Sequence, residues 1–152
     1  DLVCGLVLCD TAAKIGNETM WNDRIEIARN GGLEALLEAN MQRWFSPNFH
    51  KNNQIELRGY EAMFSRTPLE GYIGTGTAIR DADFTSKASS ISVPTTCVVG
   101  EYDGATNPEL VEGTAKLIPG SKFEVIKNAG HIPCAEQPKE IIQIIREMIA
   151  II

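Results

Sequence analysis

Two short polar loops of this chain carry residue types that can do acid–base chemistry. His131 lies in "NAGHIPCAEQP", residues 128–138, and Asp103 lies in "VVGEYDGATNP", residues 98–108. Histidine changes its protonation state near neutral pH, and a carboxylate that accepts a hydrogen bond from one ring nitrogen leaves the other nitrogen free to act as a base. Such a pair suits the activation of a hydroxyl group for attack on a carbonyl carbon.

The elements around these loops alternate between strand and helix. In chain order they are the predicted strand "TTCVVG" (95–100), the predicted helix "NPELVEGTAKLIPG" (107–120), the predicted strand "KFEVIKNAG" (122–130) and the predicted helix "QPKEIIQIIREMIAII" (137–152). This order is typical of a parallel sheet with helices on its faces. Ligands bind beyond the carboxyl ends of such strands, so the sheet would bring Asp103 and His131 together.

Other interpretations of these two residues stay open at this point. A loop histidine can simply hydrogen-bond its neighbours, and Asp103 also suits a turn before Gly104. Glu101 competes with Asp103 for the acid role. Position favours Asp103, because Glu101 immediately follows the last glycine of the predicted strand.

The first half of the chain has a different character. "LVCGLVLCD" (2–10) is a continuous apolar run of strand length, which predicts a strand buried on both faces. Helical spacing follows in two stretches, one from a cap at Asn17 to Gly31 and Gly32, the other from Leu33 to Trp44 with an end at "SPNF". Two weaker helical stretches lie near 55–64 and 69–79, the second loosened by glycines, and a Ser-rich linker covers 85–94.

Composition narrows the class of protein. A chain of 152 residues with 43% hydrophobic and 22% charged residues suits one globular domain. The net charge of −6, without any cluster of Lys and Arg, argues against nucleic acid as a partner. No apolar run has the length of a membrane span, so we expect no membrane partner. The four cysteines follow no metal or redox spacing, which favours a reduced, cytoplasmic setting.

Five stretches of the chain resemble the α/β-hydrolase superfamily, and within it the 3-oxoadipate enol-lactonases. They are "LVLCDTAAKIG", "RWFSP", "GYIGTGTAIRDADF", "VVGEYDGATNP" and "NAGHIPCAEQP". The resemblance implies a partial α/β-hydrolase fold, the C-terminal parallel strands with flanking helices, plus a helical cap. Residues 1–10 would be a strand of the core sheet, 11–86 the helical cap, and 87–152 the C-terminal part of the core with the Asp and His loops.

One feature of that superfamily does not occur in this sequence. Its nucleophile is a serine in a G-x-S-x-G turn between a strand and a helix, and none of the serines here has glycines at that spacing. We therefore expect the nucleophile to lie outside this chain, in a missing N-terminal half, and the chain alone to be inactive. An exposed sheet edge would bind that half, or a second copy in a homo-oligomer.

The resemblance implies a carboxylic ester (lactone) hydrolase that opens the enol-lactone ring to 3-oxoadipate in aromatic catabolism. His131 would be the base and Asp103 its partner, with neither metal nor organic cofactor. The substrate is a small anion, for which Arg43 and Trp44 of "RWFSP" are the expected binding residues and Arg24 and Arg80 are weaker alternatives. Arg43 is equally well read as a solvated charge, and Trp44 as a core anchor.

Two other classes of function stay open. The fold also hosts other esterases, dehalogenases and cofactor-free haloperoxidases. A non-catalytic ligand-binding protein, or a structural fragment of an α/β-hydrolase, would use the same fold without chemistry.

Overall fold

The central strand of the sheet is the most deeply buried one. In the computed structural model, which describes residues 2–152, β2 (Thr95–Gly100) lies between β1 (Leu6–Cys9) and β3 (Lys122–Ile126), and both pairings are parallel. Every residue of β2 is buried. A strand with a neighbour on each side and a helix on each face has little contact with solvent, so even the polar Thr95 and Thr96 are buried.

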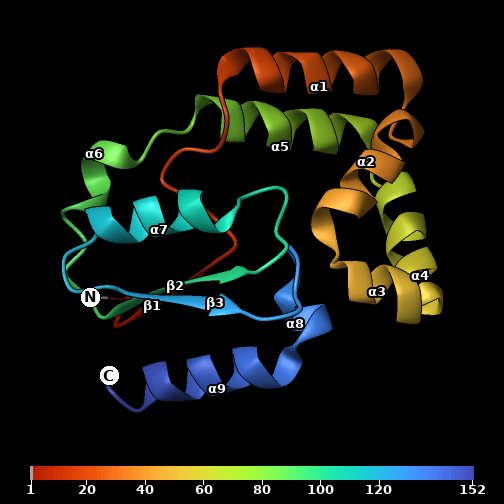
Figure 1. Ribbon diagram of the computed structural model, residues 1–152. Coiled ribbons are helices and arrows are strands. Elements are labelled where there is room, and N and C mark those ends of the chain that lie inside the picture. The colour runs from red at the N-terminus through yellow and green to blue at the C-terminus, as the bar shows by residue number, and fades with distance from the viewer. Residues whose placement is uncertain (1) are drawn as a thin grey trace.

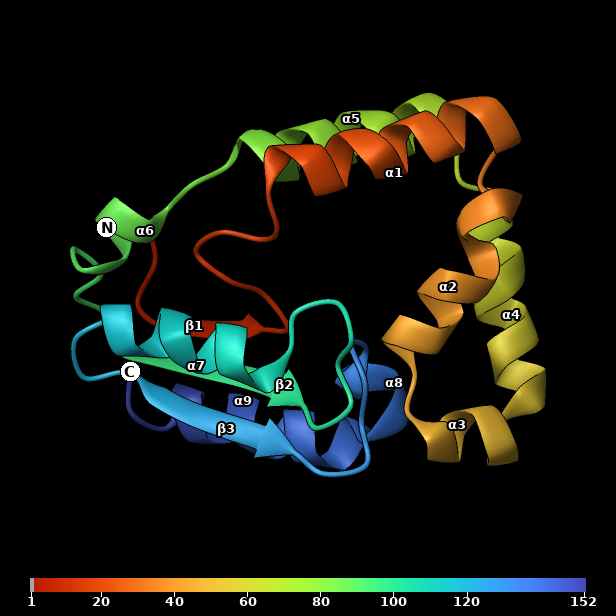
Figure 2. The ribbon, with the colours of Figure 1, turned by 45° about the horizontal axis from the view of Figure 1, so that its top comes forward.

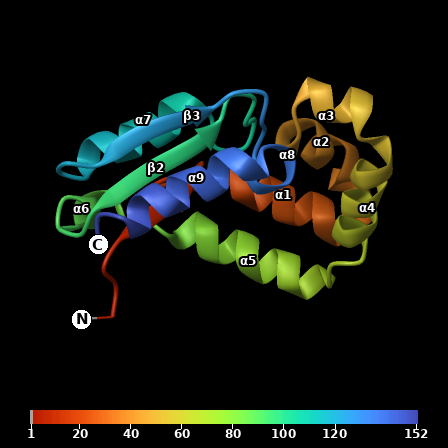
Figure 3. The same ribbon diagram turned by 90° about the horizontal axis from the view of Figure 1, so that it is seen from below.

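Two helices cover the faces of this sheet. α7 (Pro108–Leu117) packs on one face and α9 (Pro138–Ile149) on the other (Figures 1 and 3). Because side chains alternate along a strand, Cys97 and Val99 face α7 while Val98 faces α9. The predicted strand–helix order from 95 onward is therefore confirmed.

The first strand differs from its prediction. The apolar run 2–10 was expected to be one strand buried on both faces, but only Leu6–Cys9 pairs, and its residues are partly or fully exposed. β1 bonds to β2 along one edge, and within residues 2–152 no strand lies along its other edge. An apolar run alone does not tell how many faces and edges of the strand are covered, whereas the exposed sheet edge predicted from the sequence agrees with the unpaired edge of β1 within residues 2–152.

A group of helices lies beyond the carboxyl ends of the strands. α1 (Glu18–Gly31) and α5 (Leu69–Asp81) lie side by side, and α2 (Glu34–Trp44) packs along α4 (Gln54–Ser65), as Figure 2 shows. A short helix, α3 (Pro47–Asn52), joins α2 to α4. Their shared core contains aliphatic and aromatic side chains, and within it the rings of Phe45 and Phe49 stack with centroids 4.6 Å apart.

The ends of α1 follow its local sequence as predicted. Asn17 accepts a hydrogen bond from the Met20 amide at 2.9 Å, which satisfies one of the free N–H groups at the helix start. Gly32 ends the helix with φ of 69°, in the left-handed region that favours glycine. α5 is continuous from Leu69 to Asp81 across the glycines that were expected to loosen it, and Gly76 is buried where α5 packs against Trp21 and Ile25 of α1.

Three short helices were not predicted. The stretch "SPNF" ends one helix, as predicted, but it also begins α3, since Ser46 Oγ accepts the Phe49 amide at 3.2 Å and Pro47 fits the first turn. α6 (Thr85–Ala88) replaces part of the expected linker, and α8 (Pro133–Glu136) follows His131. Among the helices of residues 2–152, none is both long and apolar enough to cross a bilayer.

Candidate active site

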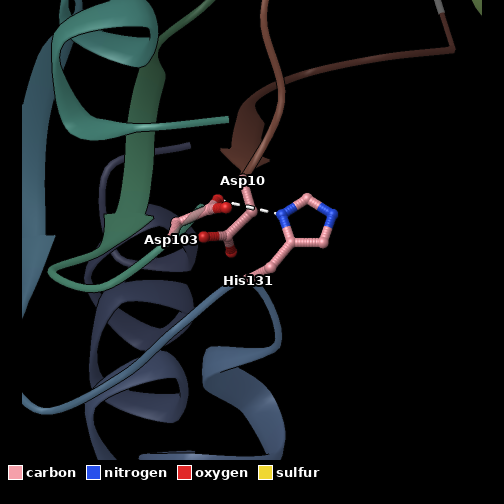
Figure 4. Close-up of side chains that lie close together, drawn as sticks. All are labelled: Asp10, Asp103 and His131. Atoms are coloured by element: carbon pink, nitrogen blue, oxygen red, sulfur yellow. Dashed lines mark hydrogen bonds and ion pairs between the residues drawn. The ribbon is translucent and has the colours of Figure 1, made fainter. Parts of the chain in front are cut away.

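Three side chains converge where the three strands end. Asp10 follows β1, Asp103 follows β2 and His131 follows β3, and Figure 4 shows them directed toward one another. His131 Nδ1 and Asp103 Oδ2 are 2.9 Å apart. The structure therefore brings Asp103 and His131 together at this edge of the sheet, as the order of the strands and loops predicts.

Asp103 is held rigidly by its own loop. Its Oδ1 accepts the amides of Ala105 and Thr106 at 2.7 and 2.9 Å, and Oδ2 accepts the Thr106 hydroxyl at 2.8 Å. Burial alone would raise the pKa of Asp103, but the hydrogen bond and charge of His131, with the Thr106 bonds, outweigh it and keep that pKa below its ordinary value. Asp103 is therefore ionised at neutral pH, so the proton in the Asp103–His131 bond resides on Nδ1 and leaves Nε2 free.

The close approach of the two loops depends on Gly100. A Cβ at this position would lie 1.9 Å from the carbonyl oxygen of Gly130. The amide of Tyr102 donates to the carbonyl of Ala129 at 2.8 Å, which ties the Asp103 loop to the His131 loop. Glycine at the end of β2 is thus what permits the carboxylate and the imidazole to meet.

Glu101, the competing acid, lies elsewhere. Its carboxylate pairs with Lys127 Nζ at 2.9 Å and accepts the Asn128 amide at 3.1 Å. These bonds hold the pKa of Glu101 below its ordinary value, with the Lys127 hydrogen bond as the largest cause. The geometry therefore favours Asp103 over Glu101 as the partner of His131.

The sequence reasoning missed Asp10. Its Oδ1 accepts the Gly100 amide at 3.0 Å and its Oδ2 accepts the Cys9 thiol at 2.9 Å. Burial raises the pKa of Asp10 to about 6, despite the opposing hydrogen bonds from Cys9 and Gly100. Its position in the sequence could have indicated it as a site residue, because Asp10 ends the first apolar run just as Asp103 and His131 follow the other two predicted strands.

These three residues also have the composition of a metal site. One possible ligand atom from each of Asp10, Asp103 and His131 lies within 4.8 Å of the others. Every carboxylate oxygen of the two aspartates already accepts a hydrogen bond from the protein, and Nδ1 of His131 is committed to Asp103. The arrangement fits acid–base chemistry better than metal ligation.

Arg43 and Trp44 connect the helical group to both loops. The amide of Gly104 donates to the Arg43 carbonyl at 2.9 Å, and Arg43 Nε returns a bond to the Gly104 carbonyl at 3.0 Å. The His131 amide donates to the Trp44 carbonyl at 2.8 Å, and the Trp44 ring faces the imidazole with centroids 6.3 Å apart. These two residues therefore hold the loops in place as well as lying beside the site.

Glu136 of α8 adds a third connection. Its carboxylate accepts the Gly130 amide at 2.7 Å and the Ser46 amide at 3.1 Å, and it also accepts the Ser46 hydroxyl. Gly130 precedes His131, and Ser46 begins α3. One carboxylate thus fixes the His131 loop to the helical group, a role that no sequence pattern indicated.

A cavity of about 690 Å³ opens beside His131 and Thr106. Its walls are mainly apolar and come largely from α1, α2 and α5, with further residues from α4, α7 and the Asp103 loop, and Arg24, Arg43 and Trp44 are among them. Burial, followed by the nearby charge of Arg24, lowers the pKa of Arg43. Arg80, the other alternative, lies outside this cavity and bonds to Asp81 and Asn22.

Comparisons with known proteins agree with this architecture. No family model matches the chain. The chain is 35% identical over 140 residues to 3-oxoadipate enol-lactonase 1 of Acinetobacter baylyi, a match that covers 91% of the chain and 52% of the relative. The enol-lactonase of Burkholderia xenovorans LB400 superposes with a TM-score of 0.92 at 29% identity, over 97% of the chain and 56% of that protein.

A thermophilic esterase from Thermogutta terrifontis superposes with a TM-score of 0.88 at 30% identity, over 97% of the chain and 56% of that protein. The fold is therefore a partial α/β-hydrolase fold, and the chain belongs to the α/β-hydrolase superfamily. Within the superfamily it resembles the 3-oxoadipate enol-lactonases, and it spans about half the length of the relatives it matches.

Proposed function

We propose that this chain supplies the acid–base half of the active site of a carboxylic ester hydrolase that opens a small anionic lactone. The observation that carries the proposal is the 2.9 Å contact between His131 Nδ1 and the buried Asp103, at the mouth of an apolar cavity with two arginines. The likeness to enol-lactonases supports a lactone, and specifically the enol-lactone that yields 3-oxoadipate in the β-ketoadipate pathway of aromatic catabolism.

In the proposed mechanism a serine outside residues 1–152 attacks the lactone carbonyl carbon. His131 Nε2 takes the serine proton, the ring C–O bond breaks, and the imidazolium returns that proton to the departing enol oxygen. His131 then takes a proton from a water molecule as the water oxygen attacks the acyl carbon, and it passes that proton to the serine oxygen when the bond between the acyl carbon and that oxygen breaks. Asp103 keeps Nδ1 protonated and stabilises the imidazolium throughout. No metal or organic cofactor enters this sequence of steps.

Residues 11–86 form the cap in this proposal, between the core strand within 1–10 and the core segment 87–152. Arg43 and Trp44 contact the substrate from the cap, supported by their place in the cavity wall. The free edge of β1 receives the first half of the fold, or a second copy in a homo-oligomer, and neither nucleic acid nor membrane is a partner. The four free cysteines support a cytoplasmic location.

An esterase without lactone preference is the second candidate. The Thermogutta terrifontis esterase supports it, since it is 30% identical to this chain and the Burkholderia xenovorans enol-lactonase is 29% identical. That esterase was solved with malate bound, and malate is also a small anion. Both candidates share the reaction steps above and differ in the acyl group that the cavity accepts.

The test is reconstitution of activity. The chain is co-expressed with the first half of the Acinetobacter baylyi enol-lactonase, and hydrolysis of the enol-lactone and of a simple aryl ester is followed. We expect turnover only with both halves present, and loss of that turnover in His131→Ala. Activity of the chain alone, or activity of the reconstituted His131→Ala protein at the wild-type rate, would contradict the proposal.

A further inference from the structure

Among residues 2–152, Asp10 is a buried carboxylate without a cationic partner. It follows β1 and is 8% exposed, and it forms no ion pair with any described lysine, arginine or histidine. Its hydrogen bonds come from the Gly100 amide and the Cys9 thiol, and neither of these groups carries a positive charge. A buried anion in such surroundings costs free energy unless a positive charge forms beside it.

The backbone of Asp10 also has an uncommon conformation. Its φ is 49°, in the left-handed region, where Asp and Asn are the most readily accommodated residues after glycine. Residues held in this region collect at active sites, where the surrounding structure keeps them in place. The bond from the Gly100 amide to Asp10 Oδ1, 3.0 Å long, ties the end of β1 to the end of β2 and so fixes where this carboxylate lies.

His131 is the group that can supply the positive charge. One carboxylate oxygen of Asp10, one of Asp103 and one ring nitrogen of His131 lie within 4.8 Å of one another, and Figure 4 shows the three side chains converging. His131 is hydrogen-bonded to Asp103 and not to Asp10. When the imidazole takes a proton in the proposed mechanism, its charge therefore forms beside two carboxylates, at a distance where unscreened charges interact directly.

The charges around Asp10 favour this role. The titratable groups that act on it lie at the ends of the three strands and are Cys9, Asp103 and His131. Further out, Cys134 of α8 acts on Cys9, and Arg43 of α2 acts on Asp103. Burial and, to a smaller extent, the charge of Asp103 raise the pKa of Asp10, while the hydrogen bonds from Cys9 and Gly100 and the charge of His131 lower it. Of the charges acting on ionised Asp10, that of His131 is the favourable one.

We propose that Asp10 is a positioning residue of the reaction, a second carboxylate that stabilises the imidazolium of His131 without bonding to it. This inference rests on the proposed hydrolase function and deepens it, because His131 gains its charge as it takes the proton of the attacking serine. The repulsion between Asp10 and Asp103 is relieved at the same moment, so the stabilisation is greater in the transition state than in the resting enzyme. Asp103 sets the tautomer of His131, and Asp10 makes His131 a stronger base.

The test removes the charge of Asp10 and keeps its shape, in the full-length protein that contains this chain. Asp10→Asn retains an oxygen that accepts the Gly100 amide, and asparagine tolerates the left-handed backbone. Asp23→Asn, the same change at an exposed position of α1, is the matched control. Urea unfolding checks that both variants are folded. Hydrolysis of 4-nitrophenyl acetate gives kcat and KM as functions of pH, and His131→Ala tests the hydrolase function itself.

Asp10→Asn should lower kcat about tenfold and leave KM within about two-fold, because the described walls of the cavity beside His131 do not include Asp10. The acidic limb of the pH profile of kcat/KM should move about one unit toward lower pH, since an imidazole with one negative neighbour fewer takes a proton only at lower pH. Asp23→Asn should match wild type. If Asp10→Asn matches wild type in kcat and in pH profile while His131→Ala is inactive, the role of Asp10 is overturned and the hydrolase function stands.

A titration that needs no substrate separates this inference from the proposed function. The ring C–H resonances of His131 in NMR spectra report its protonation as the pH is changed. The midpoint should fall by about one pH unit in Asp10→Asn and stay unchanged in Asp23→Asn, while the Nδ1–H resonance persists in both because Asp103 remains its acceptor. A shifted midpoint supports the role of Asp10 even where no ester is hydrolysed. Equal midpoints in wild type and Asp10→Asn would refute that role.

Discussion

Substitution of Gly100 by alanine tests the idea that one missing side chain lets the two loops meet. The new Cβ would lie 1.9 Å from the Gly130 carbonyl oxygen and 2.6 Å from the Ala129 carbonyl oxygen, both of them backbone atoms. To reach even 3.0 Å, the His131 loop must retreat by about 1.1 Å. Overpacking of this kind costs about 1–3 kcal/mol of folding free energy.

The same displacement should damage catalysis more than stability. A retreat of this size lengthens the 2.9 Å bond between His131 and Asp103 beyond hydrogen-bond range. Misplacement of a catalytic group by about 1 Å costs on the order of a hundred-fold in rate. In the full-length protein, urea unfolding measures the stability of Gly100→Ala, and ester hydrolysis measures its kcat.

Gly113→Ala is the matched control. Gly113 lies in α7, where an added Cβ would meet no other atom within 4 Å. Alanine in a helix is favoured over glycine by about 0.5–1 kcal/mol, so this variant should be as stable as wild type or more so, with unchanged kcat. If Gly100→Ala keeps wild-type stability and kcat while Gly113→Ala behaves as expected, the reasoning about loop approach is refuted.

Three further predictions concern carboxylates around the site. The pKa of Asp10 is raised from 3.8 to about 6, so the folded state holds the carboxyl proton more tightly than the unfolded state does. The free energy of unfolding should therefore fall as pH rises from about 4 to about 6. Urea unfolding of Asp10→Asn should lack this pH-dependent component. Asp103→Asn should lower kcat roughly a thousand-fold or more in ester hydrolysis, because His131 loses the acceptor that sets its tautomer; an unchanged kcat would exclude Asp103 as that partner. Glu136→Ala should cost about 2–4 kcal/mol in urea unfolding, since it strands the Gly130 and Ser46 amides, whereas Glu136→Gln, which keeps an acceptor, should cost less.

The pairing of Asp103 with His131 could be predicted from the sequence because the order of the strands brings their two loops to one edge of the sheet. Parallel strands that are consecutive in the chain place their following loops at one edge of the sheet, whatever the side chains of the core are. The ends of α1 were accessible for a similarly local reason, since Asn17 and Gly32 act on backbone groups within four residues.

The remaining parts of the site depend on contacts that the sequence does not encode locally. Arg24, Asn40 and Tyr72 come from three helices, and only the packing of those helices brings their polar atoms together. Glu136 acts on Ser46, 90 residues away in the chain. Asp10 belongs to the site because β1 pairs with β2 in parallel, so that the first strand ends at the same edge of the sheet as the other two.

The hydrogen bond from His131 Nδ1–H to Asp103 underlies the whole proposed mechanism. NMR of the imidazole N–H protons in the full-length protein is its most direct test. We expect a strongly downfield Nδ1–H resonance in wild type that disappears in Asp103→Asn and persists in Glu101→Gln, because Glu101 is bonded to Lys127 instead. A resonance that survives in Asp103→Asn, or one that is lost in Glu101→Gln, would contradict it.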